Sequence, residues 1–199
     1  MTLGRRYFED LYESGDDPWG FRTRWYEGRK RQLTLAALPR PYYENVFEPG
    51  CATGLLTREL AARSGRILAM DISASALLSA RAGRPENVEF RRGAVPADWP
   101  AGFFDLVVVS ELGYYLDEED CKQLGDLAAS TGGDLVAVHW RHPVQEYPLT
   151  GDRVHHIIER SAADHGLARL CRHDERDFRL AVWSHDRRSV GERTGLVGR

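Results

Sequence analysis

The sequence contains little cysteine, and its three cysteines follow no structural pattern. Cys51, Cys121 and Cys171 are odd in number, far apart and outside any metal-ligand spacing. Neither a disulfide framework nor a zinc site is therefore indicated, and we expect no bound metal. A reducing, cytoplasmic setting fits this use of cysteine.

Long apolar runs and an excess of one charge are missing as well. No segment reaches the roughly 18 apolar residues of a membrane-spanning helix, and no N-terminal segment has the pattern of a secretion signal. The formal net charge is -3, with acids interspersed among the arginines, which argues against a broad surface for nucleic acid. We therefore expect neither membrane nor nucleic acid as a partner. With 42% hydrophobic residues in 199, the chain is long enough for one globular domain.

Strand and helix patterns alternate from Val46 onward, which predicts an α/β fold with a mostly parallel sheet. Buried strands are expected at Ile67–Met70, Val88–Arg91 and Leu106–Val109, and a fifth in LVAVHW. Near the end, LARLCRHDERDFRLAVWSHD contains two alternating runs around a charged turn. These runs predict a hairpin that adds an antiparallel edge to the sheet.

The segment Val46–Leu60, VFEPGCATGLLTREL, organises the rest of the chain. It is a short strand ending in an acid, then a glycine-bracketed turn, then an amphipathic helix. Gly50 and Gly54 permit backbone angles and approach distances that a Cβ forbids, and the first N–H groups of the helix favour a negatively charged group. Glu48 would hold a positive one. A ligand with an ammonium and a carboxylate at one end fits this pairing better than a pyrophosphate.

Asp71 follows the second strand and has two interpretations. Its carboxylate can accept both hydroxyls of a ribose, as the acid about 20 residues beyond a glycine loop does in dinucleotide folds, or it can cap the helix that begins near Ser73. The glycine loop upstream favours ribose binding. A turn after the third strand, containing Ala94 and Val95, is placed beside an adenine ring, with Val95 or Ile72 against the faces of the ring.

The reacting end of the ligand is expected beyond the central strand. Ser110, Glu111 and Leu112 end that strand, and Tyr114 and Tyr115 follow, one of them expected to be a core residue. Glu111 or Tyr115 would orient an acceptor, and one of them or His139 would remove its proton. A histidine near a strand end is more commonly structural than catalytic. The segment Trp140–Asp152 is interpreted as an acceptor-binding loop.

The N-terminal region Arg5–Leu38 also has two interpretations: a helix covering the sheet, or a lid whose aromatic and basic side chains close over ligands. We expect residues 1–43 to form this helical lid, 44–186 the core of the same domain, and 187–199 a flexible tail. In the helix that follows Thr150, His155 and His156 are expected to face solvent or a partner, because the apolar stripe does not need them.

Several motifs together resemble a known family. EPGCATG, the strand end MD and the terminal hairpin look like a class I S-adenosylmethionine-dependent methyltransferase, whose sheet has seven strands with the last one antiparallel. More narrowly, DPWGFRTRWYEGRKR, SELGYYL and VAVHWRHPVQEYPLTGD resemble the nodulation protein S family, rhizobial N-methyltransferases of deacetylated chitooligosaccharides. The similarity runs from about Tyr7 to about Asp186.

The resemblance implies S-adenosylmethionine as cofactor, S-adenosylhomocysteine as product and these positions around them. The methionine part would be surrounded by Glu48, Gly50, Cys51 and Gly54, and the ribose would be held by Asp71. The adenine would lie beside Ala94 and Val95, and the sulfonium end would be lined by Ser110, Glu111 and Leu112. The lid would contribute Trp19 and Lys30. Ala52 replaces a common glycine, and Ala94 replaces an acid that binds the adenine amino group in many relatives. Weaker cofactor binding through backbone groups is therefore predicted.

We expect methyl transfer to an amine of a small polar acceptor, with an aminosugar or oligosaccharide first. The alternatives are a hydroxyl or carboxylate of a secondary metabolite as acceptor, and a non-catalytic cofactor-binding module. A nicotinamide-dependent oxidoreductase is disfavoured, because the loop lacks the G-x-G-x-x-G pattern and Glu48 would repel a pyrophosphate.

Overall fold

The most apolar segments of the chain form the centre of a seven-stranded sheet. This computed structural model describes residues 1–15 and 17–197. The central strands are β1 (Tyr43–Pro49), β4 (Phe104–Ser110) and β5 (Gly132–Trp140). In β4 the residues from Leu106 to Val109 have no exposed surface. Such continuous burial is typical of a parallel strand covered on both faces.

The strand order is β3-β2-β1-β4-β5-β7-β6. Here β2 is Ser64–Asp71, β3 Val88–Arg92, β6 Ala168–Asp174 and β7 Phe178–Ser184. Only β7 pairs antiparallel, with β5 on one side and β6 on the other, among the strands of the described residues. The predicted mostly parallel sheet with an antiparallel last strand is confirmed, and so is the predicted hairpin.

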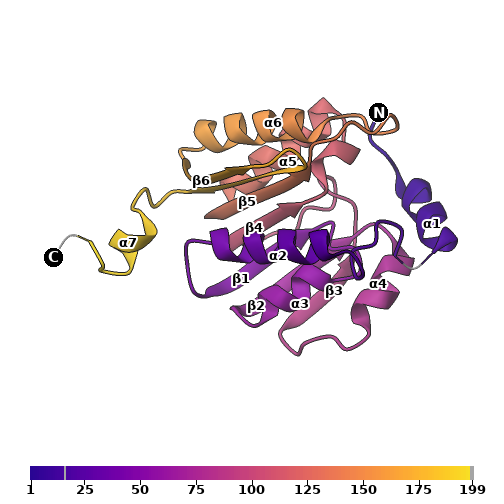
Figure 1. Ribbon diagram of the computed structural model, residues 1–199, viewed down its shortest axis with the longest axis horizontal. Coiled ribbons are helices and arrows are strands. Elements are labelled where there is room, and N and C mark those ends of the chain that lie inside the picture. Colours follow the sequence, from indigo (N-terminus) through magenta and orange to yellow (C-terminus); the bar gives the residue numbers. More distant parts are fainter. Residues whose placement is uncertain (16, 198–199) are drawn as a thin grey trace.

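Helices cover both faces of the sheet and give three layers (Figure 1). On one face lie α2 (Trp25–Ala37), α3 (Leu55–Ala61) and α4 (Ala74–Arg81), and on the other α5 (Glu118–Ser130) and α6 (Gly151–Asp164). Successive strand residues point to opposite faces of the sheet. Val46 packs on the face of α2, α3 and α4, and Phe47 packs on the face of α5 and α6. A short 3-10 helix, η1 (Gly113–Tyr115), follows β4.

Polar residues cap the start of three of these helices, two of them at the starts predicted near Ser73 and after Thr150. Ser73 Oγ accepts the Ala76 N–H of α4 at 3.1 Å, and Asp117 and Thr150 accept corresponding N–H groups of α5 and α6. Each cap is worth about 1 kcal/mol. Because Ser73 supplies the cap of α4, Asp71 is left for another role.

The N-terminal region contributes two helices, and they differ in their packing. Helix α2 lies on the sheet, where Leu38 at its end is buried and Leu33 packs against the core. Helix α1 (Arg5–Ser14) has no buried residue and lies beside the end of α4 (Figure 1). The covering interpretation therefore holds for α2, and the lid remains a prediction.

The chain ends in a short helix, α7 (Val190–Arg193), which begins with a capping box between Ser189 and Glu192. Arg193 donates to Ser184 Oγ at 3.0 Å. The predicted flexible tail at 187–199 includes Gly198 and Arg199, which lie outside the described residues, and its flexibility stays a prediction. Among the described residues, no helix combines the length and apolar character needed to cross a membrane.

One expectation about α6 is wrong. His156 is exposed as predicted, but His155 is only 3% exposed. The reason is helical spacing, since position 155 shares a face with Ile158 and Ala162. Its ring lies 5.1 Å from the His139 ring, centroid to centroid, and neither of its ring nitrogens has a hydrogen-bond partner among the described residues. Burial lowers the pKa of His155 well below its usual range.

This burial predicts how stability depends on pH. The unfolded chain binds a proton at His155 below about pH 6.5, while the folded chain does not, so the free energy of unfolding should decrease as the pH falls from about 6.5. His155→Phe should flatten this decrease in melting temperature between pH 7 and pH 4.5. His156→Phe, the same change at the exposed neighbour, should leave it as steep as in the wild type. Equal slopes in all three proteins would contradict the assignment.

Candidate active site

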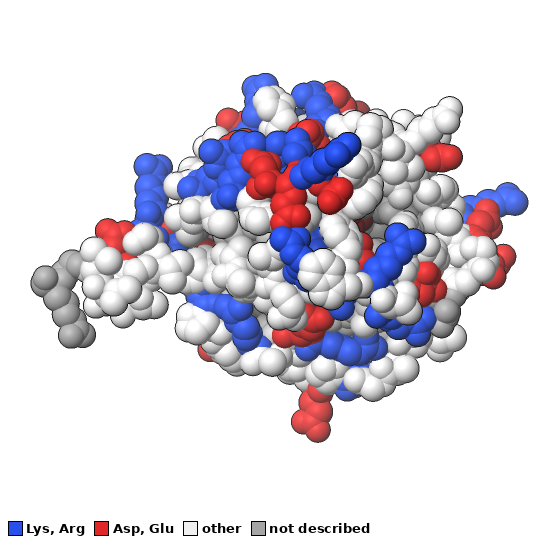
Figure 2. Space-filling model, viewed as in Figure 1, with Lys and Arg blue, Asp and Glu red and all other residues white. Residues whose placement is uncertain are grey.

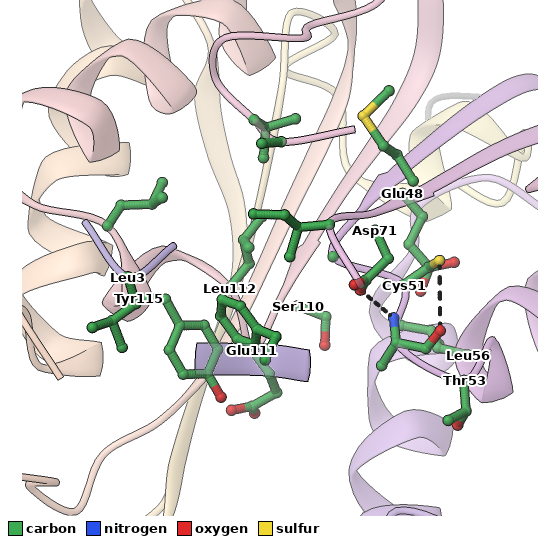
Figure 3. A pocket seen from close by; sticks show the side chains of 18 of the residues that line it. Leu3, Glu48, Cys51, Thr53, Leu56, Asp71, Ser110, Glu111, Leu112 and Tyr115 are labelled. Atoms are coloured by element: carbon green, nitrogen blue, oxygen red, sulfur yellow. Dashed lines mark hydrogen bonds between the residues drawn. The ribbon is translucent and has the colours of Figure 1, made fainter. Parts of the chain in front are cut away.

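A cavity of about 310 Å³ lies at the carboxyl ends of β1, β2 and β4. The order of the strands reverses between β1 and β4, and in open α/β sheets this is where ligands bind. Figure 3 shows the lining in two groups on opposite sides: Glu48, Cys51, Thr53 and Asp71 in one, and Ser110, Glu111, Leu112 and Tyr115 in the other. The volume is within the range of small-molecule sites, about 300–1,000 Å³.

The structure brings most of the sequence-predicted site residues together in the wall of this cavity. Those that line it are Trp19, Lys30, Glu48, Gly50, Cys51, Asp71, Ile72, Ala94, Val95, Ser110, Glu111, Leu112 and Tyr115. Gly54 and His139 do not line it. Their roles as ligand-binding or catalytic residues are therefore not supported by position.

The two glycines of the loop have different tasks. Both have a positive φ, of 71° at Gly50 and 74° at Gly54. A Cβ at Gly50 would lie 3.1 Å from the Leu112 side chain across the cavity, whereas one at Gly54 would lie 2.9 Å from the ring of Phe90. Gly50 thus keeps the cavity open, and Gly54 lets the loop pack on β3.

The N–H groups of the glycine loop itself are already bonded, whereas the role predicted for the first N–H groups of helix α3, which begins at Leu55, stays a prediction. Gly50 and Cys51 both donate to the carbonyl of Met70, at 2.7 and 3.0 Å, and Ala52 donates to Asp71 Oδ2 at 2.8 Å. These bonds fix the loop against the end of β2.

Asp71 joins two loops at the cavity wall. Besides Ala52, it accepts the N–H of Ser73 through Oδ1 at 2.9 Å, and it is 9% exposed. Burial raises the pKa of its carboxyl group. Each carboxylate oxygen has a further acceptor position, so the side chain is held in place with capacity for ribose hydroxyls. Ribose binding remains the prediction for this residue.

Glu48 is the buried acid at the end of β1. It is 2% exposed, and its Oε2 atom has no hydrogen-bond partner among the described residues. Burial raises the pKa of this carboxyl group to about 8. A buried acceptor without a partner is costly, and an ammonium group in the cavity would satisfy it. The residues present therefore fit the zwitterionic tail that the sequence suggested.

The predicted adenine end shows one departure. The Ala94 N–H, which was expected to serve the adenine edge, donates to Asp98 Oδ2 at 2.8 Å. Ile72, Gly93 and Val95 line the cavity there. The apolar contacts predicted for the ring are thus present in the wall, but this backbone donor is taken.

A buried ion cluster forms the wall beyond Glu111. Lys30 is 4% exposed, and its Nζ lies 2.8 Å from Glu111 Oε1 and 2.9 Å from Glu27 Oε2. Although burial opposes the charge, the two carboxylates hold the pKa of Lys30 above its usual value. Glu27 was missed by the sequence analysis. Its i,i+3 spacing to Lys30 on a helix is the signal that could have identified it.

Glu111 is held on both of its oxygens. Its Oε2 accepts the hydroxyl of Tyr114 and, at 3.2 Å, the N–H of Trp140. The residue has a φ of 54°, a strained conformation for a residue with a side chain. Lys30, Tyr114 and the β5 end together keep the carboxylate in one position.

Tyr114 and Tyr115 are both in the core cluster, but only Tyr115 lines the cavity. Its hydroxyl lies 3.2 Å from that of Tyr147, and its carbonyl accepts the N–H of Leu3 at 2.8 Å. Tyr115 thereby joins the cavity wall to the N-terminal segment. One of the two tyrosines was expected to be a core residue, and Tyr114 has that position.

His139 has no exposed surface. Its Nε2 accepts the N–H of Gly113 at 3.1 Å, and burial, with Lys30 nearby, lowers its pKa to about 3. A histidine that is neutral, bonded and outside the cavity orients the turn after β4. The geometry supports the structural interpretation of His139 and not the catalytic one.

The expected acceptor loop does not reach the cavity. Arg141 binds Asp152 through two bonds of 2.8 and 2.9 Å, and His142 Nε2 lies 2.7 Å from Asp177 Oδ1. No residue from Trp140 to Asp152 lines the cavity within the described chain. Figure 2 shows Lys and Arg mixed with Asp and Glu over the visible face of the molecule.

The N-terminal segment covers the other side of the cavity. Leu3, Phe8, Tyr12 and Phe21 belong to its lining. Glu9 fastens α1 to the start of α4, where it accepts from the Ala74 N–H at 2.8 Å, Ser75 Oγ at 2.9 Å and Ser73 Oγ at 3.1 Å. Arg92 pairs with the same carboxylate at 3.4 Å.

The comparisons with known proteins agree with this fold and site. A family model described as a methyltransferase domain matches residues 46–131. A solved structure from Pseudomonas syringae, whose own assignment as a methyltransferase is provisional, is 43% identical, with a TM-score of 0.70, and the match covers 81% of this chain and 99% of that one. The chain belongs to the class I S-adenosylmethionine-dependent methyltransferases. The predicted family is confirmed, and S-adenosylmethionine is the cofactor that this family uses.

Within these methyltransferases the chain is similar to nodulation protein S. The protein from Rhizobium tropici is 30% identical over 130 residues, which are 62% of this chain and 55% of the relative. The chain spans about half the length of the curated relatives it matches. The N-methyltransferase NodS from Bradyrhizobium japonicum in complex with S-adenosylhomocysteine shares the fold, with a TM-score of 0.78 at 23% identity, over 91% of this chain and 98% of that one.

The Glu9 contacts predict an effect on cofactor residence. Glu9→Gln should accelerate dissociation of S-adenosylhomocysteine about 5- to 30-fold, the equivalent of roughly 1–2 kcal/mol, because α1 loses its charged attachment to α4. Stopped-flow fluorescence would measure the rate. Asp10→Asn removes a neighbouring acid whose one ion pair within the described residues is with Arg6 of α1, and it should leave the rate unchanged. Equal rates for both variants would show that α1 does not retain the ligand.

The buried acid of β1 predicts an opposite pH effect. Burial raises the pKa of Glu48 in the folded chain to about 8, from about 4.5 in the unfolded chain, so its ionisation destabilises the ligand-free protein as the pH rises from about 4.5 to 8. Glu48→Gln should raise the melting temperature at pH 8.5 by several degrees, at roughly 2–4 °C per kcal/mol, and change it little at pH 5.

Two controls accompany this measurement. Glu44→Gln, at an exposed position of the same strand, should have no pH-dependent effect. Glu48→Gln should also weaken S-adenosylhomocysteine binding in isothermal titration, because the amide holds an ammonium less strongly than a carboxylate does. Stabilisation without loss of affinity would remove Glu48 from the ligand site.

Proposed function

We propose that this methyltransferase transfers the methyl group of S-adenosylmethionine to an amine of a small polar acceptor, with an aminosugar or a short aminosugar oligomer as the first candidate. The observation that carries the proposal is the charge balance at the cavity wall. Two carboxylates, Glu27 and Glu111, face one ammonium, Lys30, and all three line the cavity.

This balance favours a cationic acceptor. Arg31 also lines the cavity, but its guanidinium is paired with Glu59 at 2.7 Å, so the cluster of Glu27, Lys30 and Glu111 keeps one negative charge in excess. Because Lys30 and Glu27 are both less than 10% exposed, this charge attracts an ammonium group more strongly than it would in water. A carboxylate acceptor would be repelled by the same charge. The similarity to nodulation protein S and to the N-methyltransferase NodS also supports an amine as the methyl acceptor.

The remaining residues have tasks that follow from their positions. Glu48 would hold the ammonium of the methionine tail, Asp71 the ribose hydroxyls, and Ser110 and Leu112 would line the sulfonium end. The sulfonium is already an activated methyl donor, so the protein has mainly to align donor and acceptor in a dry cavity and to supply an unprotonated nitrogen. We expect this chemistry to take place in the cytoplasm.

A methylation assay with purified protein tests the proposal. Release of S-adenosylhomocysteine should occur with glucosamine and glucosamine oligomers. N-acetylglucosamine, which has the same hydroxyls but no free amine, is the matched control and should give no detectable turnover, because the electron pair of its amide nitrogen is delocalised into the carbonyl group. Hydroxylated metabolites and carboxylic acids complete the panel.

The other outcomes distinguish the alternatives. Equal turnover with N-acetylglucosamine or a hydroxylated metabolite would mean O-methylation. Tight binding of S-adenosylhomocysteine without methylation of any amine would favour a non-catalytic cofactor-binding module. Either result would overturn amine methylation as the activity.

A further inference from the structure

We propose that Glu27, from helix α2, is the catalytic base that takes the proton from the acceptor amine, and that Glu111 orients the acceptor without accepting its proton. The inference rests on the proposed amine methylation and deepens it. It rests on how the two carboxylates of the cavity wall are bonded.

Glu111 is fixed in position by three different groups. Its Oε1 is paired with Lys30 at 2.8 Å, and its Oε2 accepts both the Tyr114 hydroxyl and the Trp140 N–H. Protonation of Oε2 would break one of these two hydrogen bonds in a buried site. The strained backbone at Glu111 and its three partners are the features of a fixed positioning group.

Glu27 is bonded differently. Both of its oxygens contact a single partner, Lys30 Nζ, at 2.9 and 3.2 Å. Further acceptor positions on both oxygens therefore remain, and the side chain belongs to the cavity lining. Its backbone N–H donates to the carbonyl of Arg24 at 3.1 Å, so the residue is held in the first turn of a helix that packs on the sheet.

The surroundings of Glu27 also favour proton uptake. Burial raises the pKa of this carboxyl group, and the negative charge of Glu111 raises it further, while Lys30 and Arg31 on the same helix act against them. Tyr26 is the remaining titratable neighbour. Arg31 is itself engaged by Glu59 at 2.7 Å and by the Phe21 carbonyl. A carboxylate with a raised pKa is a stronger general base than an exposed one.

The reaction then balances without another reactant. The acceptor enters as an ammonium attracted by the excess carboxylate, and Glu27 takes one proton to leave a neutral amine with a free electron pair. When bound, the cofactor supplies the methyl group: the nitrogen forms the new N–C bond as the C–S bond breaks, and that electron pair stays on sulfur. Lys30 keeps its charge throughout and holds both carboxylates in place.

The test compares Glu27→Gln with Glu111→Gln across pH. With glucosamine oligomers as acceptor, Glu27→Gln should lower kcat at pH 7 by about 100- to 1,000-fold and move the rising limb of the pH profile to the pKa of the free amine. Turnover should then recover as the pH rises above that value. The affinity for S-adenosylhomocysteine should change less than about 3-fold, because the lost group does not hold the cofactor.

Glu111→Gln should lower turnover by a similar factor at every pH, so its profile keeps the wild-type limb. The matched control is Glu175→Gln, which removes a carboxylate that pairs with Arg29 of α2 at 2.5 Å but does not line the cavity. Its kinetics and pH profile should equal those of the wild type.

The outcomes separate this inference from the proposed function. If the wild type methylates the amine and Glu27→Gln retains the wild-type limb, with or without lower turnover, Glu27 only anchors Lys30 and the inference is overturned. If the shifted limb appears in Glu111→Gln instead, Glu111 is the base. If the wild type methylates no amine, the proposed function fails, and the role of Glu27 fails with it.

Discussion

The reversal of strand order between β1 and β4 is the constraint on which the site depends. Parallel strands buried on both faces require helical crossovers, and where the winding changes direction no crossover helix covers the strand ends. Glu48 and Asp71 lie at the carboxyl ends of β1 and β2, and Glu111 directly follows the neighbouring β4. The cavity therefore exists because of topology, and its chemistry comes from the residues at the ends of these strands.

Buried charge is the second organising feature. Glu48 has no ion-pair partner among the described residues, and burial raises the pKa of its carboxyl group, whereas Lys30 lies between two carboxylates. Buried ions without partners are costly, and removing one partner leaves the others exposed to that cost. The two regions consequently suit different ligand groups: an isolated acid accepts a donor, and an ion cluster with one surplus negative charge attracts a cation. We therefore expect the methionine tail of the cofactor beside Glu48 and the acceptor beside the ion cluster of Lys30.

The N-terminal segment completes the cavity and adds only partly buried residues to the core. Helix α1 has no buried residue, yet Phe8 and Tyr12 line the cavity and Glu9 binds the start of α4. A segment held by polar contacts and little apolar burial has low local stability compared with the core. This is the physical combination that a ligand-dependent cover requires. Helix α2, by contrast, carries Glu27 and Lys30 on an element that packs on the sheet, so their positions do not depend on the contacts of α1.

The sequence by itself determined the fold and most of the cavity lining. Periodicity, caps and the acid-ended strands are local signals, and they identified the parallel sheet, the terminal hairpin and residues such as Asp71 and Glu111. What only the tertiary structure decided were the partners of each group. His155 is buried because helical spacing turns it inward, His139 is bonded to a turn outside the cavity, and Gly54 faces Phe90. Glu27 joins Glu111 through Lys30 although 84 positions separate the two acids in numbering. Local patterns specify which residues end a strand or begin a helix. Whether two carboxylates share one ammonium group, and whether a carboxylate oxygen has a hydrogen-bond partner, depends on packing between distant segments.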